Sequence, residues 1–270
     1  MFFDTRLEQD SCWWLDEVPC LHRLHEAIPI EGAHKIQYEI GMSLSIQKME
    51  EKLSVLSVRV HKSNADFNLQ QKALLTFDDG HKDVLLAVPI LKNFPDIQPV
   101  LFLTRNQLNN DVRPLPLTSL YTWCSKYNLN PNELESKYGF NRTSLKLLPE
   151  NAQREILVKA GIDINPACEE MLNASEIRHL VLNGWLIGYH GSSHCDLRIF
   201  SSKSLEPKFA EDLALLRRMN YVPWIAWPEG RWNNSISTMA CEQGFYFQFG
   251  LEKETGVGSK SYCINRKIWK

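Results

Sequence analysis

Two apolar runs in this chain end abruptly in reactive side chains, and this feature constrains the fold most. Leu74–Phe77 leads directly into two aspartates and a glycine at positions 78–80, and Trp185–Tyr189 leads directly into His190. Short apolar, β-prone runs bounded by turn residues are typical of buried strands. Enzymes that alternate strands with helices carry their chemistry where such strands open into loops. The sequence therefore predicts an α/β fold with both clusters at strand ends.

Together the two clusters supply the side chains that a catalytic metal centre needs. Asp78 and Asp79 provide carboxylates, and His190 and His194 provide imidazoles. A zinc-type cation binds nitrogen and carboxylate oxygen and, when catalytic, keeps a position open for water. One aspartate with two histidines suits it, and the other aspartate stays free as a base. Taken singly, Asp-Asp-Gly is equally a turn, and His-x-x-x-His is more often two ordinary histidines. The shared strand-end context favours a site.

Three short motifs stand at these positions and further along the chain. Thr-Phe-Asp-Asp-Gly is complete at Thr76–Gly80, His-x-x-x-His is met by His190 and His194, and Trp-Pro-Glu-Gly stands at Trp227–Gly230. In these motifs the chain resembles the polysaccharide deacetylases, the NodB homology domain of the carbohydrate esterases. The resemblance implies an irregular, distorted and incomplete (β/α) barrel with its site at the C-terminal ends of the strands.

The resemblance also implies a role for each motif residue. Asp78 would be the general base, and Asp79, His190 and His194 would bind a divalent metal ion. Zinc is expected first, with cobalt, nickel or manganese as alternatives, and no other cofactor is implied. The backbone N–H of Glu229 would meet the oxyanion. The implied reaction is hydrolysis of an N-acyl group, acetyl in the expected case, from an amino sugar in a small molecule or glycan precursor.

Several positions depart from the family pattern. The segment before Pro228 lacks the arginine that orients the base. Arg231 and Arg266 are the candidates to replace it, although arginines that flank strands are more often solvated or paired at the surface. Glu229 stands where the family commonly has an aromatic residue. The late leucine and histidine motif, which supplies the general acid, has no match in residues 262–269, so the proton donor is unassigned.

Three other functions stay open on the sequence alone. A related group within the same superfamily hydrolyses non-sugar amides, including ring amides, and sometimes works without metal. A catalytically inactive carbohydrate-binding homologue would explain the missing arginine and acid, but all four metal and base positions are retained. A purely structural metal site is disfavoured because structural zinc generally has four protein ligands and three are evident here.

Composition and charge narrow the class of protein. The chain has 270 residues, of which 44% are hydrophobic and 23% charged, as in ordinary globular proteins. A net charge of -2 gives no general affinity for nucleic acid or anionic lipid. No run approaches the roughly 18 apolar residues that span a bilayer, and residues 1–8 lack a signal-peptide core, so we expect a cytoplasmic protein. That location favours a precursor in surface-polysaccharide or O-antigen synthesis as the substrate.

Seven scattered cysteines fit reduced thiols better than a disulfide framework. Cys195, beside His194, is expected to be a small buried hydrophobic residue. The histidines at positions 22, 25, 34 and 61 have no metal-site spacing, so we expect them to be packing or surface residues.

We expect one domain over residues 1–270, with a helical insertion at about 106–173. Within the insertion, residues 121–124, 134–138 and 152–160 have helical patterns separated by Asn-Pro and glycine breaks. Earlier in the chain, the spacing of apolar residues predicts a helix from Ser45 through Leu53, followed by a strand over Val55–Val60. The insertion would pack beside the site or serve in dimerisation, and the sequence leaves the oligomeric state open.

Overall fold

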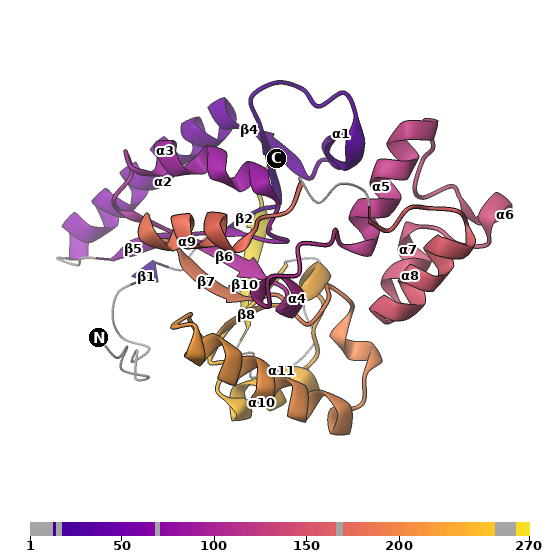
Figure 1. Ribbon diagram of the computed structural model, residues 1–270. Helices are drawn as coiled ribbons and strands as arrows, with labels where there is room; N and C mark the ends of the chain where they lie inside the picture. The colour runs from indigo at the N-terminus through magenta and orange to yellow at the C-terminus, as the bar shows by residue number, and fades with distance from the viewer. Residues whose placement is uncertain (1–12, 15–17, 68–70, 166–169, 252–262) are drawn as a thin grey trace.

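The structure is a computed structural model that describes residues 13–14, 18–67, 71–165, 170–251 and 263–270. A ring of parallel strands lies at its centre (Figure 1). The strands follow one another around the ring in the order β5, β2, β10, β9, β8, β7 and β6, and the pairing of β6 with β5 closes it. Their bounds are β2 Val18–Leu21, β5 Lys72–Phe77, β6 Ile97–Leu103, β7 Leu186–Tyr189, β8 Trp224–Ala226, β9 Phe247–Leu251 and β10 Cys263–Ile268.

The expected fold class, an α/β protein with a distorted (β/α) barrel, is confirmed. Seven described strands make the ring, one fewer than in a standard (β/α) barrel. The first strand of the ring, β2, lies between β5 and the last strand, β10. Three short strands add to this arrangement: β1 (Trp13–Trp14) pairs with the start of β5, and β3 (Arg23–His25) pairs with β4 (Ser43–Ser45).

Alternate residues along the strands belong to two different apolar clusters, as the two-residue period of a strand requires. Leu74 and Phe102 belong to a smaller cluster that fills the barrel; five of the seven strands contribute buried residues to it, and the other two, β7 and β10, pack against it. Leu75 and Leu101 belong to the larger cluster between the strands and the surrounding helices. Apolar residues therefore line both faces of these strands.

Helices cover the outside of the barrel. In Figure 1, α2 and α3 lie on one side of the ring and α10 and α11 on the opposite side. No helix in the described part of the chain is both long enough and apolar enough to cross a bilayer. The helices and 3-10 turns around the barrel are α2 Ile46–Phe67, η1 Lys82–Leu86, α3 Ala87–Leu91, α4 Arg105–Leu108, α9 Ala174–Leu182, η3 Leu197–Ile199, α10 Ser202–Arg218, η4 Pro228–Gly230 and α11 Asn234–Gln243.

The predicted strand over Val55–Val60 is wrong, because α2 continues without a break through Phe67. Val55 and Val58 are exposed, whereas the side chains at helical spacing on the opposite face are buried. The helical period of the apolar residues therefore overrides the β preference of the valines. The buried residues on that face are Met49, Leu53, Leu56 and Val60.

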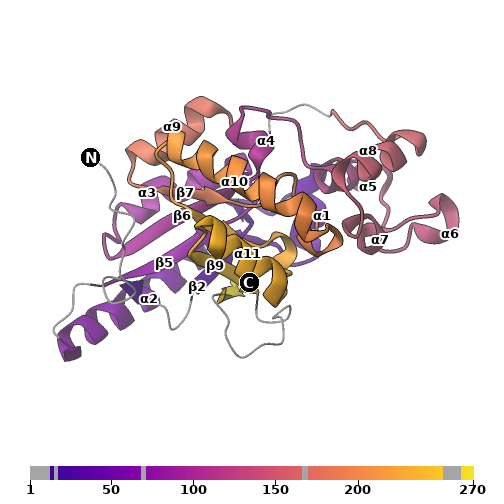
Figure 2. The same cartoon turned by 90° about the horizontal axis from the view of Figure 1, so that it is seen from below.

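A group of helices between β6 and β7 lies to one side of the barrel in both views (Figures 1 and 2). We call it the α5–α8 region, residues 116–159. It has its own apolar cluster, which includes Leu120, Leu145 and Leu157, and α1 (Gly32–Glu39) from outside the region completes that cluster with Ala33 and Ile36. The helices of the region are α5 Pro116–Tyr127, α6 Glu135–Tyr138, α7 Arg142–Lys146 and α8 Glu150–Lys159.

The five described cysteines are all free thiols. Cys195 is buried in the larger apolar cluster, as expected from its sequence context. Cys12, Cys168 and the segment of residues 1–8 considered above lie outside the described residues.

Candidate active site

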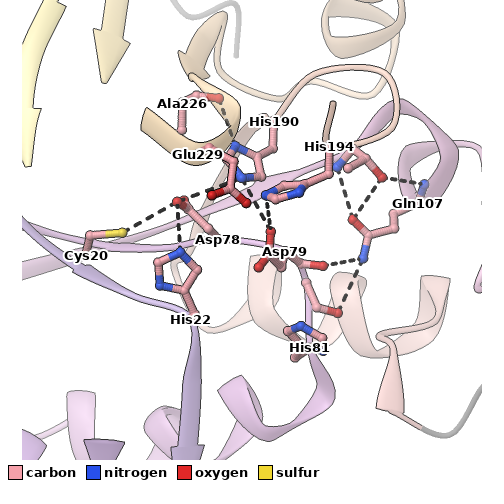
Figure 3. A network of polar contacts seen from close by, with 12 residues as sticks. Cys20, His22, Asp78, Asp79, His81, Gln107, His190, His194, Ala226 and Glu229 are labelled. Atoms are coloured by element: carbon pink, nitrogen blue, oxygen red, sulfur yellow. Dashed lines mark hydrogen bonds and ion pairs between the residues drawn. The ribbon is translucent and has the colours of Figure 1, made fainter. Parts of the chain in front are cut away.

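Polar side chains follow three barrel strands and enter one site (Figure 3). β2 is followed by His22, β5 by Asp78 and Asp79, and β7 by His190. β5 pairs with both β2 and β6, and β6 pairs with β7. Because these strands are parallel, their C-terminal ends meet at one end of the barrel. The two apolar runs of the sequence therefore deliver their polar residues to the same place.

Asp79, His190 and His194 form a compact group that could hold a metal ion. Oδ1 of Asp79 lies 3.0 Å from Nε2 of His194 and 3.4 Å from Nε2 of His190. Nδ1 of His190 lies 2.8 Å from the carbonyl oxygen of Ala226. Donation of the Nδ1 proton to that carbonyl leaves the lone pair on Nε2, which faces Asp79. Metal-binding histidines are usually oriented by such a partner on the other ring nitrogen.

Two buried atoms in this group make no hydrogen bond of good geometry: Nε2 of His190 and Oδ1 of Asp79. Buried polar atoms almost always have a partner, so two unpartnered atoms that face each other call for an explanation. A divalent cation would satisfy both atoms at once. Two imidazole nitrogens and one carboxylate oxygen suit zinc and leave a position for water. The residues present therefore fit the metal that the motifs imply.

The charges of this group are strongly coupled. Burial raises the pKa of Asp79, but the charge of the adjacent His194 and the close approach of both imidazoles lower it, and the net result is a pKa well below the usual range. Burial lowers the pKa of His194, but the Asp79 carboxylate raises it to about 9. A metal ion that bound here would displace the proton on His194, because a ligating imidazole must be neutral.

A braced turn presents Asp79 to the site. Asp79 and Gly80 both have left-handed backbone angles, with φ of 71° and 65°. A Cβ atom on Gly80 would lie 2.4 Å from Nε2 of Gln107, so only glycine fits. The same Nε2 donates to the carbonyl oxygen of Asp79 at 2.7 Å. Thr104 and Gln107 form a capping box at the start of α4, which fixes the Gln107 side chain.

Asp78 is held by a buried arginine from the last strand. Nη1 and Nη2 of Arg266 donate to the two carboxylate oxygens at 2.7 and 2.8 Å. Burial raises the pKa of Asp78, but the Arg266 charge and then His190 lower it, to about 2. Asp78 is therefore a carboxylate at neutral pH. Its Oδ2 lies 3.9 Å from Nε2 of His190, beside the metal-binding group.

The third motif lies in η4, next to the two histidines. A Cβ atom on Gly191 would lie 2.9 Å from Cγ of Pro228, so the turn after β7 packs tightly against this motif. Glu229 has a left-handed backbone with φ of 58°. Its side chain forms an ion pair with Lys146, the last residue of α7. The α5–α8 region therefore reaches the site through Lys146.

No family model matches the chain, and no curated protein matches it. Several solved structures do match the chain. A Streptococcus pyogenes deacetylase in complex with acetate matches with a TM-score of 0.54 and 15% identity, over 94% of this chain and 91% of that chain. A Bacillus cereus polysaccharide deacetylase matches with a TM-score of 0.56 and 14% identity, over 93% of this chain and 64% of that chain. A de-N-acetylase from Aggregatibacter actinomycetemcomitans matches with a TM-score of 0.54 and 14% identity, over 93% of each chain.

The chain has the fold of the polysaccharide deacetylases. At these identities the matches show the fold, and the reaction has to be argued from the site. In this polysaccharide deacetylase fold, the four motif residues considered as base and metal ligands lie together at the C-terminal ends of the strands. Figure 3 shows Asp78 and Asp79 on one side and His190 and His194 facing them.

The two arginines considered as replacements lie in different places. Arg266 contacts Asp78 directly. Nη1 of Arg231 lies 3.6 Å from Oδ2 of Asp196, which also accepts from Arg198. Within the deacetylase fold, the structure therefore brings Arg266, and not Arg231, to the carboxylate of the first motif.

Sequence reasoning missed three residues of the site: Cys20, His22 and Lys146. Sγ of Cys20 lies 3.5 Å, and Nε2 of His22 3.9 Å, from Oδ2 of Asp78. Cys20, His22 and Asp78 have ligand atoms near enough to one another for a second metal, but Arg266 already pairs with both oxygens of Asp78. One signal could have found His22, because the buried run Val18–Leu21 ends directly before it, as Leu74–Phe77 ends before Asp78.

Proposed function

We propose that this protein is a metal-dependent hydrolase that removes an N-acyl group, acetyl first, from an amino sugar. One observation carries the proposal: a two-histidine, one-aspartate group that fits a divalent cation stands beside a second carboxylate that a buried arginine keeps ionised. The polysaccharide deacetylase fold supports it, since the solved structures of that fold described above include deacetylases.

Asp79, His190 and His194 would hold the metal, and zinc is the ion that their donor atoms suit best. When bound, the metal polarises the amide carbonyl and makes its water more acidic. The hydrogen bond of His190 to Ala226 keeps Nε2 available, and the Gln107 contact holds the Asp79 backbone. These contacts keep the ligand atoms in place before the metal and substrate arrive.

Asp78 would accept the proton of the attacking water. Its pKa of about 2 keeps it ionised at neutral pH, so it can accept a proton there. Because its pKa is low, Asp78 holds that proton only weakly once it has accepted it. Arg266 fixes the orientation of the carboxylate through both oxygens, and the Cys20 thiol donates to Oδ2 as well.

The tetrahedral intermediate carries a negative charge on the former carbonyl oxygen. We assign the backbone N–H of Glu229 as one donor to it, because this residue lies in the third motif beside the histidines. Its left-handed φ turns the peptide relative to the preceding proline. Preorganised backbone donors of this kind act where charge develops and need no rearrangement.

For the substrate itself, we propose a precursor in surface-polysaccharide or O-antigen synthesis, processed in the cytoplasm. This finer assignment rests on the sequence composition and on the departures from the family motifs. N-acetylated nucleotide sugars are therefore the first compounds to screen, and ring amides are the second set.

The test is metal content and turnover in matched variants. We expect about one zinc-type ion per chain, lost in His190→Ala and in His194→Ala and kept in Asp78→Asn, whose turnover should fall by roughly 100-fold or more because a general base is worth that much. His179→Ala and Asp66→Asn change exposed residues and serve as controls. Metal-free protein under metal-replete conditions, or full turnover in Asp78→Asn, would refute the proposal.

A further inference from the structure

The proposed reaction needs a proton that none of the residues described so far supplies. When the C–N bond of the tetrahedral intermediate breaks, the amine leaves with the bonding electron pair and must gain a proton. Asp78 is a poor carrier for that proton, because Arg266 donates to both of its carboxylate oxygens and so stabilises the ionised form. Nε2 of each metal-binding histidine faces Asp79, and Nδ1 of His190 lies against the carbonyl oxygen of Ala226.

Lys146 brings an ammonium group to this site from outside the barrel. It ends α7 in the α5–α8 region, and its side chain is only 7% exposed. The ammonium has three hydrogens, and in the described part of the chain one of them contacts Oε2 of Glu229. The ammonium therefore has hydrogens that the contact with Glu229 does not use.

The Lys146 ammonium pairs with Glu229 beside the metal-binding group. Figure 3 shows the Glu229 side chain pointing toward His190 and His194. The charges of Glu229 and Lys146 both act on His194: the carboxylate raises the pKa of the imidazole and the ammonium lowers it. The ion pair thus lies beside the group that would hold the metal and the scissile amide.

The other polar groups near the site suit proton donation less well. Arg142, Arg231 and Arg266 are guanidinium groups, which do not release a proton at neutral pH. His22 lies beside the base, and burial lowers its pKa, so its ring is neutral. Lysine combines a charge at neutral pH with a proton that it can give up.

Burial of the ion pair needs an explanation of its own. Taking two charges out of water costs free energy, and a buried ion pair is often no more stable than apolar residues of the same size. Burial also lowers the pKa of Lys146, against the opposing effect of Glu229. A lower pKa makes an ammonium a better acid, and the carboxylate keeps it charged until the substrate arrives.

We propose that Lys146 is the general acid of this enzyme and that Glu229 positions it. The inference rests on the proposed function. As the C–N bond breaks, an N–H bond of Lys146 breaks and its proton joins the substrate nitrogen, which leaves as a neutral amine. Lys146 is left as a neutral amine and regains a proton from solvent. Asp78 returns the water proton to solvent, so the net reaction is amide plus water to acid plus amine.

The test compares two leaving groups in variants of Lys146. An N-acetyl amino sugar needs a proton on its leaving nitrogen, whereas 4-nitrophenyl acetate releases a phenolate that needs none. We expect Lys146→Met to lower amide turnover by about 10²–10⁴-fold, the usual contribution of an acid, and to leave ester turnover within a few-fold. Lys146→Arg keeps the charge and the pairing with Glu229 but cannot donate a proton. It should lose amide turnover equally.

Two results would overturn the assignment. Amide turnover retained in Lys146→Arg would mean that charge alone matters, and equal loss of amide and ester turnover in Lys146→Met, restored in Lys146→Arg, would mean a structural role. Lys159→Met, an exposed lysine of α8, is the matched control. The proposed function is tested separately. Its measurements are the amide turnover of the unmodified protein and of Asp78→Asn, and the metal content of all variants.

Discussion

At the scale of single residues, two opposing effects decide the state of Asp78. Burial alone would favour its neutral form, and the paired guanidinium of Arg266 favours the carboxylate. The guanidinium dominates because it contacts both oxygens at hydrogen-bond distance. The base of the proposed reaction is therefore kept ionised by a residue from the far end of the sequence.

Removal of that guanidinium should change the pH dependence of turnover. The pKa of Asp78 is about 2 in the folded protein, so activity that needs its ionised form is present above that pH and is lost as pH falls through it. In Arg266→Gln, burial remains without the counter-charge, so the pKa rises and the acid limb of kcat/KM should move to higher pH by at least one unit. Arg231→Gln, which contacts Asp196 instead, should leave the limb in place.

An unchanged acid limb in Arg266→Gln would show that another group controls it. Metal content must be measured in the same samples, because loss of the ion would also lower activity at acid pH. A shift in the limb with the metal retained would locate the effect at Asp78.

At the scale of elements, the turns at the strand ends determine the geometry of the site. Each turn reverses the chain in a few residues and packs against its neighbour, as Gly80 does against Gln107 and Gly191 against Pro228. A side chain at either position would need both a left-handed backbone and space that another residue fills.

Gly80→Ala should therefore be more harmful than a left-handed glycine replaced elsewhere. Gly139 has a similar φ of 75°, and nothing lies within 4 Å of a Cβ built there. Gly139→Ala should cost only the backbone strain, about 1–2 kcal/mol. Gly80→Ala adds a clash with Gln107, of about 1–3 kcal/mol, and should lower Tm several degrees further and weaken metal affinity. Equal Tm values for the two variants would contradict this account of the turn.

At the scale of the whole molecule, the α5–α8 region and the barrel depend on each other. The apolar cluster of the region includes Ala33 and Ile36 of α1, and α1 comes between β3 and β4 in the chain, well before the region itself. Lys146 in turn pairs with Glu229 at the barrel rim. These contacts support our prediction that residues 1–270 form one domain.

A core substitution in the region tests this prediction. Leu157 is fully buried in the apolar cluster of the α5–α8 region, and Leu157→Ala should lower the free energy of unfolding by about 2–5 kcal/mol. If the chain is one domain, thermal unfolding stays a single transition at a lower temperature. Val158→Ala, at an exposed position next to it, should change little. Two separate transitions would show that the region unfolds independently of the barrel.

The sequence by itself determined the fold class and the positions of Asp78, Asp79, His190 and His194 at strand ends. It could do so because strand patterns and the motifs are local, and each is readable within a few residues. Local propensity also misled, since the valines of α2 suggested a strand that their helical spacing excludes.

Only the tertiary structure decided which distant residues complete the site. Arg266 reaches Asp78 because β10 and β5 both flank β2. The helical region that carries Lys146 is held in place where α5 packs on α1, which in turn packs on β3 and β4. His22 joins the site because β2 ends beside β5. Contacts of this kind arise from strand order and helix packing, which bring together residues that no short window of sequence contains.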